Sequence, residues 1–389
     1  MYAFGITRDK ITDILKIPLN KRIPSECIQL MECKKPIPKA DEVVVEVKGA
    51  GLNYNSVWQS LCHPMNSKQL VDGHIKRNPL DANHSQDYYI FGSDGSGVVS
   101  EIGCNVSSFK KDDEVVIHCN VVQQSSKLKD DMLSNTQSIW GYETNYGSFA
   151  EYTCVKESQL LLKPHFLNWP NSGSYMLTLA TAYRMLISKN GSKIKKGEFC
   201  LIWGASGGLG YFAIQLCILV GAIPVCIVSS KDKETYCKKL GATFVINLDE
   251  YEDSFMLEND KPNYIFWHKL KIKINYLIKA QIDVVFEHIG KDTLGFSVYL
   301  LKRGGRVVTC AASSGYLSTI DLRYLWMELK TIIGSHFANI NEAKLANDLV
   351  LNNLIKVESE TVIQFEEIPR YLDKLYYRDN IKGKIAVKI

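Results

Sequence analysis

Two different patterns of hydrophobic and polar residues divide the chain. From Ile23 to about Tyr152, short apolar runs such as VVVEVKGAGLN (residues 43–53) and GSGVVSEIG (95–103) are separated by Gly, Asn and Asp. Runs of this kind are typical of β-strands joined by turns. We therefore predict an antiparallel, partly barrel-like structure for this part of the chain.

Two long polar stretches interrupt the first pattern, at residues 62–88 and 120–138, and both are rich in Lys, Asn, Ser and Asp. They exceed the usual length of a loop. The sequence leaves two interpretations open, a functional lid or a mobile segment.

From about Ser172 the pattern changes to helices that alternate with buried strands. The strand segments are FCLIWGA, IPVCIVSS, ATFVINL, DVVFEHI and GRVVTCAAS. Alternation of this kind predicts a doubly wound parallel sheet. A lysine-rich insertion at residues 260–279 is expected to form a surface helix. After Gly334, an amphipathic helix and a last strand, KGKIAVKI, are expected to return and complete the first domain.

These patterns predict an α/β protein with two domains. Residues 1–171, completed by 336–389, form the expected catalytic domain, and residues 172–335 form the expected nucleotide-binding domain. A length of 389 residues with 46% hydrophobic residues supports two cores.

Charge and cysteine content exclude several classes of partner. The chain has 46 basic and 42 acidic residues, a net charge of +4, and no long block of like charge, so we expect no nucleic-acid partner. Charges interrupt every apolar run near the amino terminus, and no run approaches the roughly 18 residues of a membrane span. Eleven scattered cysteines, an odd number, favour a reducing compartment. We therefore expect a cytoplasmic protein with no membrane partner.

A glycine-rich turn is the first candidate for chemistry. Residues 204–210, GASGGLG, follow a predicted strand (199–203) and precede a predicted helix (211–220). Glycines allow a tight turn and close approach to a pyrophosphate, which then lies at the positive end of the helix. A turn without a ligand is the alternative, but the strand and helix context favours a dinucleotide site. The residues assigned to it are Gly204, Ser206, Gly207, Gly208, Leu209 and Gly210.

The end of the second strand indicates which nicotinamide cofactor binds. An NAD site usually places an acid there for the ribose hydroxyls. This chain has Ser229, Ser230 and Lys233 instead, a set that suits the 2′-phosphate of NADPH. The alternative is that these are ordinary solvated turn residues, and Asp232 is the one residue that argues for NADH.

Six further segments of the chain, spread over nearly its whole length, resemble the crotonyl-CoA carboxylase/reductase family of zinc-independent medium-chain dehydrogenases/reductases. They are NYNSVW (53–58), IHCN (117–120), IWGYETNYGSFAEY (139–152), LATAYRML (179–186), VVFEHIG (284–290) and RYLWMELKTIIGSHFAN (323–339). The resemblance implies a GroES-like partly open β-barrel domain beside a Rossmann domain, and a homodimer or homotetramer.

The resemblance also implies a reaction. The family transfers hydride from NADPH to the β carbon of an α,β-unsaturated acyl-CoA, and the α carbon of the resulting enolate attacks carbon dioxide to give an alkylmalonyl-CoA. Such a product enters acetate assimilation or serves as a polyketide extender unit.

Matched residue by residue, the carbon dioxide pocket of the family falls on Asn55, Tyr142, Glu143 and His336. The resemblance implies that Asn55 donates to one oxygen of carbon dioxide, Glu143 orients His336, and His336 polarises the second oxygen. An Asx-turn side chain and a structural histidine are the alternatives for Asn55 and His336. The family more often has Phe at position 142, so the hydroxyl of Tyr142 puts the efficiency of carboxylation in doubt.

Three residues match positions that hold CoA or join subunits in the family. Arg323 and Tyr324 correspond to residues that grip the CoA phosphates, and Arg303 stands where a Lys contacts a subunit or ligand. A guanidinium suits bidentate phosphate binding. A plain surface ion pair is the alternative for Arg323.

The zinc ligands of metal-dependent relatives have no counterpart here. Where those enzymes carry Cys and then Gly-His-Glu, this chain has GLNYN (51–55) and FGSDG (91–95), which lack the thiolate and imidazole that catalytic zinc requires. We therefore expect no metal.

Three other functions remain as alternatives. A simple enoyl-thioester reductase would protonate the enolate instead of carboxylating it. A quinone or enone reductase of the same fold would not need Glu143, His336 or Arg323. A structural NADPH-binding protein, such as a lens crystallin, would need no intact polar pocket.

Overall fold

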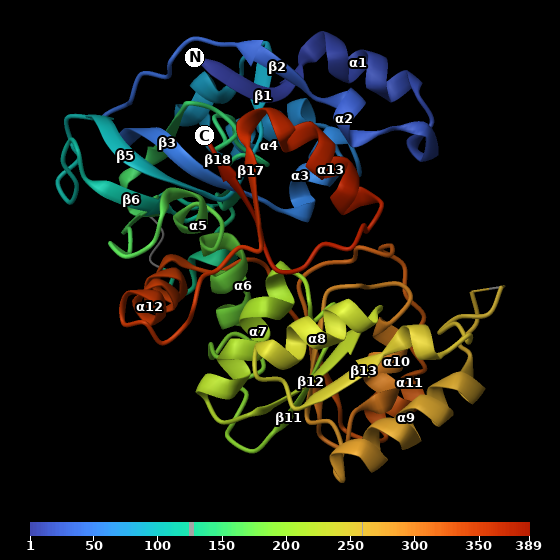
Figure 1. Cartoon of the computed structure of the whole chain (residues 1–389). Helices are drawn as coiled ribbons and strands as arrows, with labels where there is room; N and C mark the ends of the chain where they lie inside the picture. Colours follow the sequence, from blue (N-terminus) through green and yellow to red (C-terminus); the bar gives the residue numbers. More distant parts are fainter. Residues whose placement is uncertain (124–127, 259) are drawn as a thin grey trace. The chain divides into compact units, whose positions relative to one another are not determined.

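The strands expected from the first hydrophobic pattern are present in a computed structural model, which describes residues 1–123, 128–258 and 260–389. The chain divides into two units, Met1–Leu177 with Asn339–Ile389, and Thr178–Ala338 (Figure 1). The expected boundaries, after residues 171 and 335, come slightly earlier. Residues up to Leu177 remain with the first unit because Tyr175 is fully buried there and donates a 2.5 Å hydrogen bond to Asn347.

The main sheet of the first unit has the order β10-β6-β5-β3-β18-β17, and β9 also pairs with β3. Its strands are β3 (Glu42–Leu52), β5 (Gly95–Ile102), β6 (Glu114–Ile117), β9 (Tyr152–Lys156), β10 (Leu160–Leu162), β17 (Thr361–Gln364) and β18 (Ile385–Lys388). The last strand, β18, pairs antiparallel with β3, with Ile385 opposite Leu52. The end of the chain therefore completes the sheet that its first part begins.

Two smaller sheets and a set of helices surround this sheet. One sheet contains β1 (Tyr2–Thr7), β2 (Gln29–Glu32) and β4 (Tyr88–Ile90), and the other contains β7 (Asn120–Val121) and β8 (Ser138–Ile139). The helices are α1 (Arg8–Lys16), α2 (Pro24–Cys27), α3 (Tyr54–Ser60), α4 (Ser67–Arg77), α5 (Trp169–Ser172), α12 (Ile340–Leu351) and α13 (Ile368–Tyr376). The 3₁₀ segments of this unit are η1 (Leu19–Lys21), η2 (Pro79–His84), η3 (Asp131–Leu133), η4 (Glu157–Gln159) and η6 (Phe365–Glu367).

The polar stretch at residues 62–88, for which the sequence left a lid or a mobile segment open, contains regular structure. It folds into α4 and η2, and α4 begins with a reciprocal capping box between Asn66 and Gln69. Val71 and His74 lie on the buried face of α4. The second polar stretch, 120–138, contains β7, η3 and the first residue of β8, while its residues 124–127 lie outside the described part of the chain.

The second unit contains a six-stranded parallel sheet of order β13-β12-β11-β14-β15-β16. Its strands are β11 (Phe199–Ile202), β12 (Ile223–Val228), β13 (Phe244–Asn247), β14 (Val284–Glu287), β15 (Arg306–Thr309) and β16 (Thr331–Gly334). The connecting elements are α6 (Met176–Leu186), α7 (Gly208–Leu219), α8 (Lys231–Lys239), η5 (Leu248–Glu250), α9 (Tyr264–Ile278), α10 (Leu294–Leu300) and α11 (Leu322–Trp326). The predicted doubly wound parallel sheet and all five of its predicted strands are confirmed.

The lysine-rich insertion forms α9, but this helix is more than a surface element. One face of α9 is buried and joins the core of the second unit through Phe266, Trp267, Leu270, Ile274 and Ile278. These residues recur at helical spacing, which the intervening lysines obscured. Within the described residues, no helix is both long and apolar enough to span a bilayer.

Candidate active site

The glycine-rich turn lies where β11 ends and α7 begins, as the sequence predicted. Gly204 has a φ of +52°, and a Cβ there would lie 2.8 Å from the His288 ring. At Gly210 a Cβ would meet the Ala205 carbonyl at 2.3 Å, so this glycine allows the helix to pack on the strand. At Gly207 a Cβ would have only the Gly204 oxygen within 4 Å, at 3.3 Å. The turn is therefore open at Gly207, the N-cap of twelve-residue α7, where a pyrophosphate would fit.

The residues expected near the ribose follow β12, the neighbour of β11 in the sheet. Ser230 caps α8 by accepting a hydrogen bond from the backbone N–H of Lys233. The Lys233 ammonium donates to the Ser229 hydroxyl at 3.1 Å, whereas Lys231 pairs with Glu234 at 3.0 Å. Lys233 therefore holds a cation beside two hydroxyl groups at the end of the strand, which is a donor set suited to a phosphate.

Asn55 lies in the first turn of α3 and not in an Asx turn. Its amide nitrogen donates to the Ser93 hydroxyl at 2.9 Å. Its amide oxygen is buried and has no hydrogen-bond partner among the described residues. Because a hydroxyl both donates and accepts, either end of the amide can bond to Ser93. One polar end of Asn55 therefore remains available for a ligand.

Glu143 ends a tight turn that follows β8. The backbone N–H of Glu143 donates to the Ile139 carbonyl at 2.7 Å, and its Oε2 accepts the Ile139 N–H at 2.9 Å. Trp140 anchors the turn because it is buried and donates to the Tyr146 carbonyl at 2.8 Å. Burial raises the pKa of Glu143, and the nearby Arg77 cation opposes that rise.

The helix that carries Asn55 lies against the turn that carries Tyr142 and Glu143. The Gln59 amide, one helical turn after Asn55, donates to the Tyr142 carbonyl at 3.4 Å. Tyr142 and Glu143 therefore lie in a turn that the helix of Asn55 contacts through Gln59.

The fourth predicted pocket residue, His336, belongs to the second unit and follows β16. The residue is exposed by its accessible surface, although many protein atoms surround the imidazole. Loss of surrounding water and, secondarily, the Arg184 cation lower the pKa of His336 to about 4. The imidazole is therefore neutral at neutral pH, the form in which one ring nitrogen donates and the other accepts.

Two of the residues expected to hold CoA, Arg323 and Tyr324, lie on α11, and Arg303 contacts the residue after it. Arg323 forms a bidentate ion pair with Asp321, at 3.0 Å from Nε and 2.7 Å from Nη2. The Tyr324 ring packs edge-on against Tyr299, with 4.8 Å between ring centroids. Arg303 donates to the carbonyl of Met327 just after the helix, at 3.1 Å. Arg323 is thus both an exposed cation and a surface ion-pair residue, the two interpretations that the sequence left open.

A buried ion pair joins Asp94, in the FGSDG segment, to Lys384 near the end of the sequence. The Asp94 carboxylate lies 3.6 Å from the Lys384 ammonium and accepts hydrogen bonds from Asn53 (3.3 Å) and the Leu177 N–H (3.2 Å). Asp94 and Lys384 are almost completely buried. Burial raises the pKa of Asp94 and lowers that of Lys384, and their mutual attraction opposes both shifts. The sequence did not reveal this pair, whose members are distant along the chain.

One group of possible metal ligands exists among the described residues, formed by Glu42, Asp81 and His84. The ammonium groups of Lys39 and Lys156 each lie 3.5 Å from the Asp81 carboxylate. These two cations already balance the carboxylates, so we assign no metal to the group.

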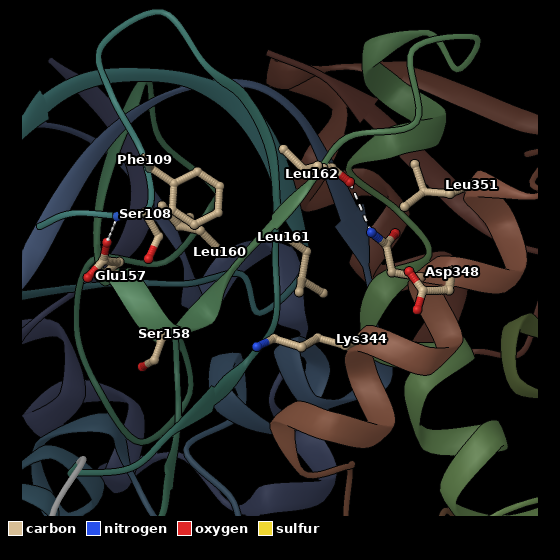
Figure 2. Close-up of a pocket in the computed structure, with 11 residues that line it drawn as sticks. Ser108, Phe109, Glu157, Ser158, Leu160, Leu161, Leu162, Lys344, Asp348 and Leu351 are labelled. Carbon is tan, nitrogen blue, oxygen red and sulfur yellow. Dashed lines mark hydrogen bonds between the residues drawn. The ribbon is translucent and has the colours of Figure 1, made fainter.

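A groove of about 370 Å³ lies between β10 and α12 in the first unit (Figure 2). Figure 2 shows Leu160, Leu161 and Leu162 on one side and Lys344 and Asp348 on the other. The predicted site residues do not line it, so we assign it no part in the chemistry.

Comparison with known proteins defines the class of the chain. The family profile for the alcohol dehydrogenase GroES-like domain matches residues 39–165, and the profile for zinc-binding dehydrogenase matches residues 208–352. The predicted GroES-like and Rossmann domains are confirmed. The protein is an NAD(P)-dependent oxidoreductase of the medium-chain dehydrogenase/reductase superfamily.

Full-length relatives define the family. The chain is 38% identical to crotonyl-CoA reductase of Streptomyces collinus (99% of this chain, 87% of the relative) and 38% identical to crotonyl-CoA carboxylase/reductase of Cereibacter sphaeroides (100% and 87%). The structure of 2-octenoyl-CoA carboxylase reductase CinF in complex with NADP and 2-octenoyl-CoA superposes with a TM-score of 0.94 at 36% identity, covering 100% of this chain and 87% of CinF. The chain belongs to the crotonyl-CoA carboxylase/reductase family, as its motifs predicted.

Proposed function

We propose that the protein catalyses the NADPH-dependent reductive carboxylation of an α,β-unsaturated acyl-CoA to an alkylmalonyl-CoA. The observation that carries this proposal is the Asn55 amide, which bonds to Ser93 at one end and has no partner at the other within the described parts of the chain. Its helix contacts the Glu143 turn through Gln59. Quinone reduction requires no such polar group. A site that binds carbon dioxide requires a small number of directed donors, because the gas is neutral and small.

The predicted cofactor and pocket residues would act as follows in the proposed reaction. The open turn at Gly207 and the Lys233 cation would hold NADPH, which supplies a hydride to the β carbon of the substrate. The α carbon of the resulting enolate then forms a bond to the carbon of carbon dioxide, whose oxygen takes up the charge. Asn55 donates to one oxygen of carbon dioxide, and a neutral His336, oriented by Glu143, donates to the other.

The CoA thioester is the proposed partner, held through α11. The exposed guanidinium groups of Arg323 and Arg303 would bind its phosphates, and Tyr324 follows Arg323 in the helix. Binding would require Arg323 to exchange its Asp321 carboxylate for phosphate, or to share the two.

The test is incubation with NADPH, a panel of enoyl-CoAs and labelled bicarbonate, followed by mass spectrometry. We expect labelled alkylmalonyl-CoA from the wild type. Glu143→Ala and His336→Ala should shift the product toward the reduced acyl-CoA while NADPH oxidation continues, since losing one hydrogen bond of roughly 1 kcal/mol lowers occupancy several-fold. Tyr142→Phe should shift it the other way if the hydroxyl admits water.

A wild type that oxidises NADPH with every enoyl-CoA but incorporates no label is a plain enoyl-thioester reductase. That result would remove the roles of Asn55, Glu143 and His336 together.

A further inference from the structure

The Glu143 carboxylate has a cationic neighbour from a distant part of the chain. Its Oε1 lies 3.6 Å from Nη2 of Arg77, the last residue of α4, while its Oε2 accepts the Ile139 N–H at 2.9 Å. Both oxygens are thus held from defined directions. The Glu143 side chain is 22% exposed and that of Arg77 38%, so the pair is only partly open to solvent.

Arg77 is fixed to the same strand that holds Glu143. Its Nη2 donates to the Ser138 hydroxyl at 2.9 Å, and Ser138 directly precedes Ile139 in β8. The guanidinium therefore contacts the carboxylate and the strand behind it at once. A mere surface ion pair would have no such second anchor.

Two donors fix the direction of the hydrogen bonds behind Arg77. An arginine donates and never accepts, so the Ser138 oxygen accepts from Arg77 at 2.9 Å. The Asn78 amide nitrogen donates toward Nδ1 of His74 at 3.2 Å, so Nδ1 is an acceptor and the Ser138 hydroxyl donates to it at 2.9 Å. His74 then carries its proton on Nε2 and donates it to the Asp81 carboxylate at 3.1 Å. His74, Ser138 and Asp81 are all at most 2% exposed, so water does not compete for these bonds.

Asp81, at the end of this series of hydrogen bonds, is an ionised acceptor. Burial favours the neutral acid, but the bond from His74 and the attraction of Lys156 outweigh it and lower the pKa of Asp81. Lys39 lies on the same carboxylate oxygen as Lys156, at 3.5 Å. Asp81 is therefore ionised at neutral pH and holds His74 in one tautomer.

We propose that Arg77 is a positioning residue for Glu143, anchored through Ser138 and His74 to Asp81, and that the segment 66–84 serves to present it. This inference rests on the proposed carboxylation. Arg77 would keep the Glu143 carboxylate ionised and orient its free lone pair. Loss of Arg77 should therefore affect the capture of carbon dioxide more than hydride transfer.

Charges around Glu143 define the expected pH response. Arg77 from α4 is the charged group of the first unit that shifts the pKa of Glu143, and the Ile139 N–H from its own turn acts in the same direction. His74 is the nearest titratable group behind Arg77. Without Arg77, less opposes the rise in the pKa of Glu143 that burial causes. Glu143 should then require a higher pH to ionise.

The experiment compares Arg77→Met, Arg77→Lys and Ser138→Ala with the matched control Lys76→Met, which removes an exposed cation from the same helix. The ratio of carboxylated to reduced product is measured with labelled bicarbonate from about pH 6 to about pH 9, together with the rate of NADPH oxidation. We expect Arg77→Met to lower the ratio at neutral pH by about fivefold and to move its half-maximal point to higher pH. Arg77→Lys should restore part of the ratio, and Lys76→Met should behave as wild type.

Several outcomes would overturn the inference. If the wild type carboxylates and Arg77→Met matches Lys76→Met in both ratio and pH profile, Arg77 does not position Glu143, although the proposed function stands. If Arg77→Met does not fold, the other two variants test the inference. A wild-type product ratio in both Arg77→Lys and Ser138→Ala would contradict the anchoring of Arg77 through Ser138. A wild type without label incorporation removes the proposed function and this inference together.

Discussion

Lys233 is the residue whose side chain bears most directly on the choice of nicotinamide cofactor. Its ammonium donates to Ser229 at the end of β12, where no acid is fixed for the ribose hydroxyls. We predict that Lys233→Ala raises the KM for NADPH about tenfold and the KM for NADH much less, since a charge-assisted contact to phosphate contributes about 1.5–3 kcal/mol. Steady-state kinetics with both cofactors measure this.

Lys231→Ala is the matched control for Lys233, because Lys231 lies in the same first turn of α8 but pairs with Glu234. It should leave the preference for NADPH intact. Equal use of the two cofactors by the wild type would contradict the assignment of Ser229, Ser230 and Lys233.

At the scale of single residues, the sequence predicts site positions only where they lie within motifs. Asn55 and Glu143 were predicted because NYNSVW and IWGYET resemble family segments. Arg77 was not found, because it lies in a polar stretch without a motif and reaches a partner, Ser138, that is 61 residues away. Such a contact exists only once α4 has folded onto β8.

At the scale of elements, the buried parallel strands were predictable and the polar helix α4 was not. Strands covered on both faces must be apolar throughout, so β11 to β15 appear as continuous runs in the sequence. In contrast, α4 buries Ser67, Val71 and His74, of which only Val71 is a strong apolar signal. The buried His74 ring is held by hydrogen bonds to Ser138 and Asp81, which composition does not reveal. The capping box at Asn66 and Gln69 was the signal that could have shown a helix.

The attachment of η2 to the rest of the first unit predicts a loss of stability in acid. His84 is 8% exposed, and its Nδ1 accepts the Asn145 N–H at 3.1 Å. Burial, followed by repulsion from His74, lowers the pKa of His84 to about 3. Between about pH 6.5 and about pH 3, the unfolded chain binds a proton that the folded chain does not, so stability falls as the pH falls through this window.

Replacement of His84 by Asn keeps an acceptor for the Asn145 N–H but cannot titrate. We predict that His84→Asn reduces the acid slope of the unfolding free energy by up to one proton, about 1.4 kcal/mol per pH unit. Urea unfolding at several pH values above and below about pH 6 measures the slope. Other histidines with lowered pKa, His288 and His336, should keep part of the slope in the variant. Identical slopes for wild type and variant would show that His84 does not carry this proton.

At the scale of the whole molecule, the second unit presents a sheet edge with apolar surroundings. Among the described residues, β16 pairs with β15 on one side and has no strand on the other. Large apolar side chains near this edge are exposed, including Leu317 (86%), Leu322 (63%), Trp326 (65%) and Leu329 (67%). An exposed edge strand with apolar neighbours is a template for pairing with another chain.

We predict that two copies of the chain associate through this edge and form at least a dimer. Continuing the six-stranded sheet across β16 would satisfy its free backbone groups, and covering the apolar side chains would supply the burial that a stable interface of roughly 800 Å² per partner requires. Light scattering at micromolar concentration should give at least twice the mass of the chain. Trp326→Asp should produce monomers, because it would bury an uncompensated charge at the interface. Leu345→Asp, at a similarly exposed apolar residue on α12 in the first unit, should leave the mass unchanged. A monomeric wild type would contradict the prediction, and so would a Trp326→Asp variant that keeps the mass of the wild type.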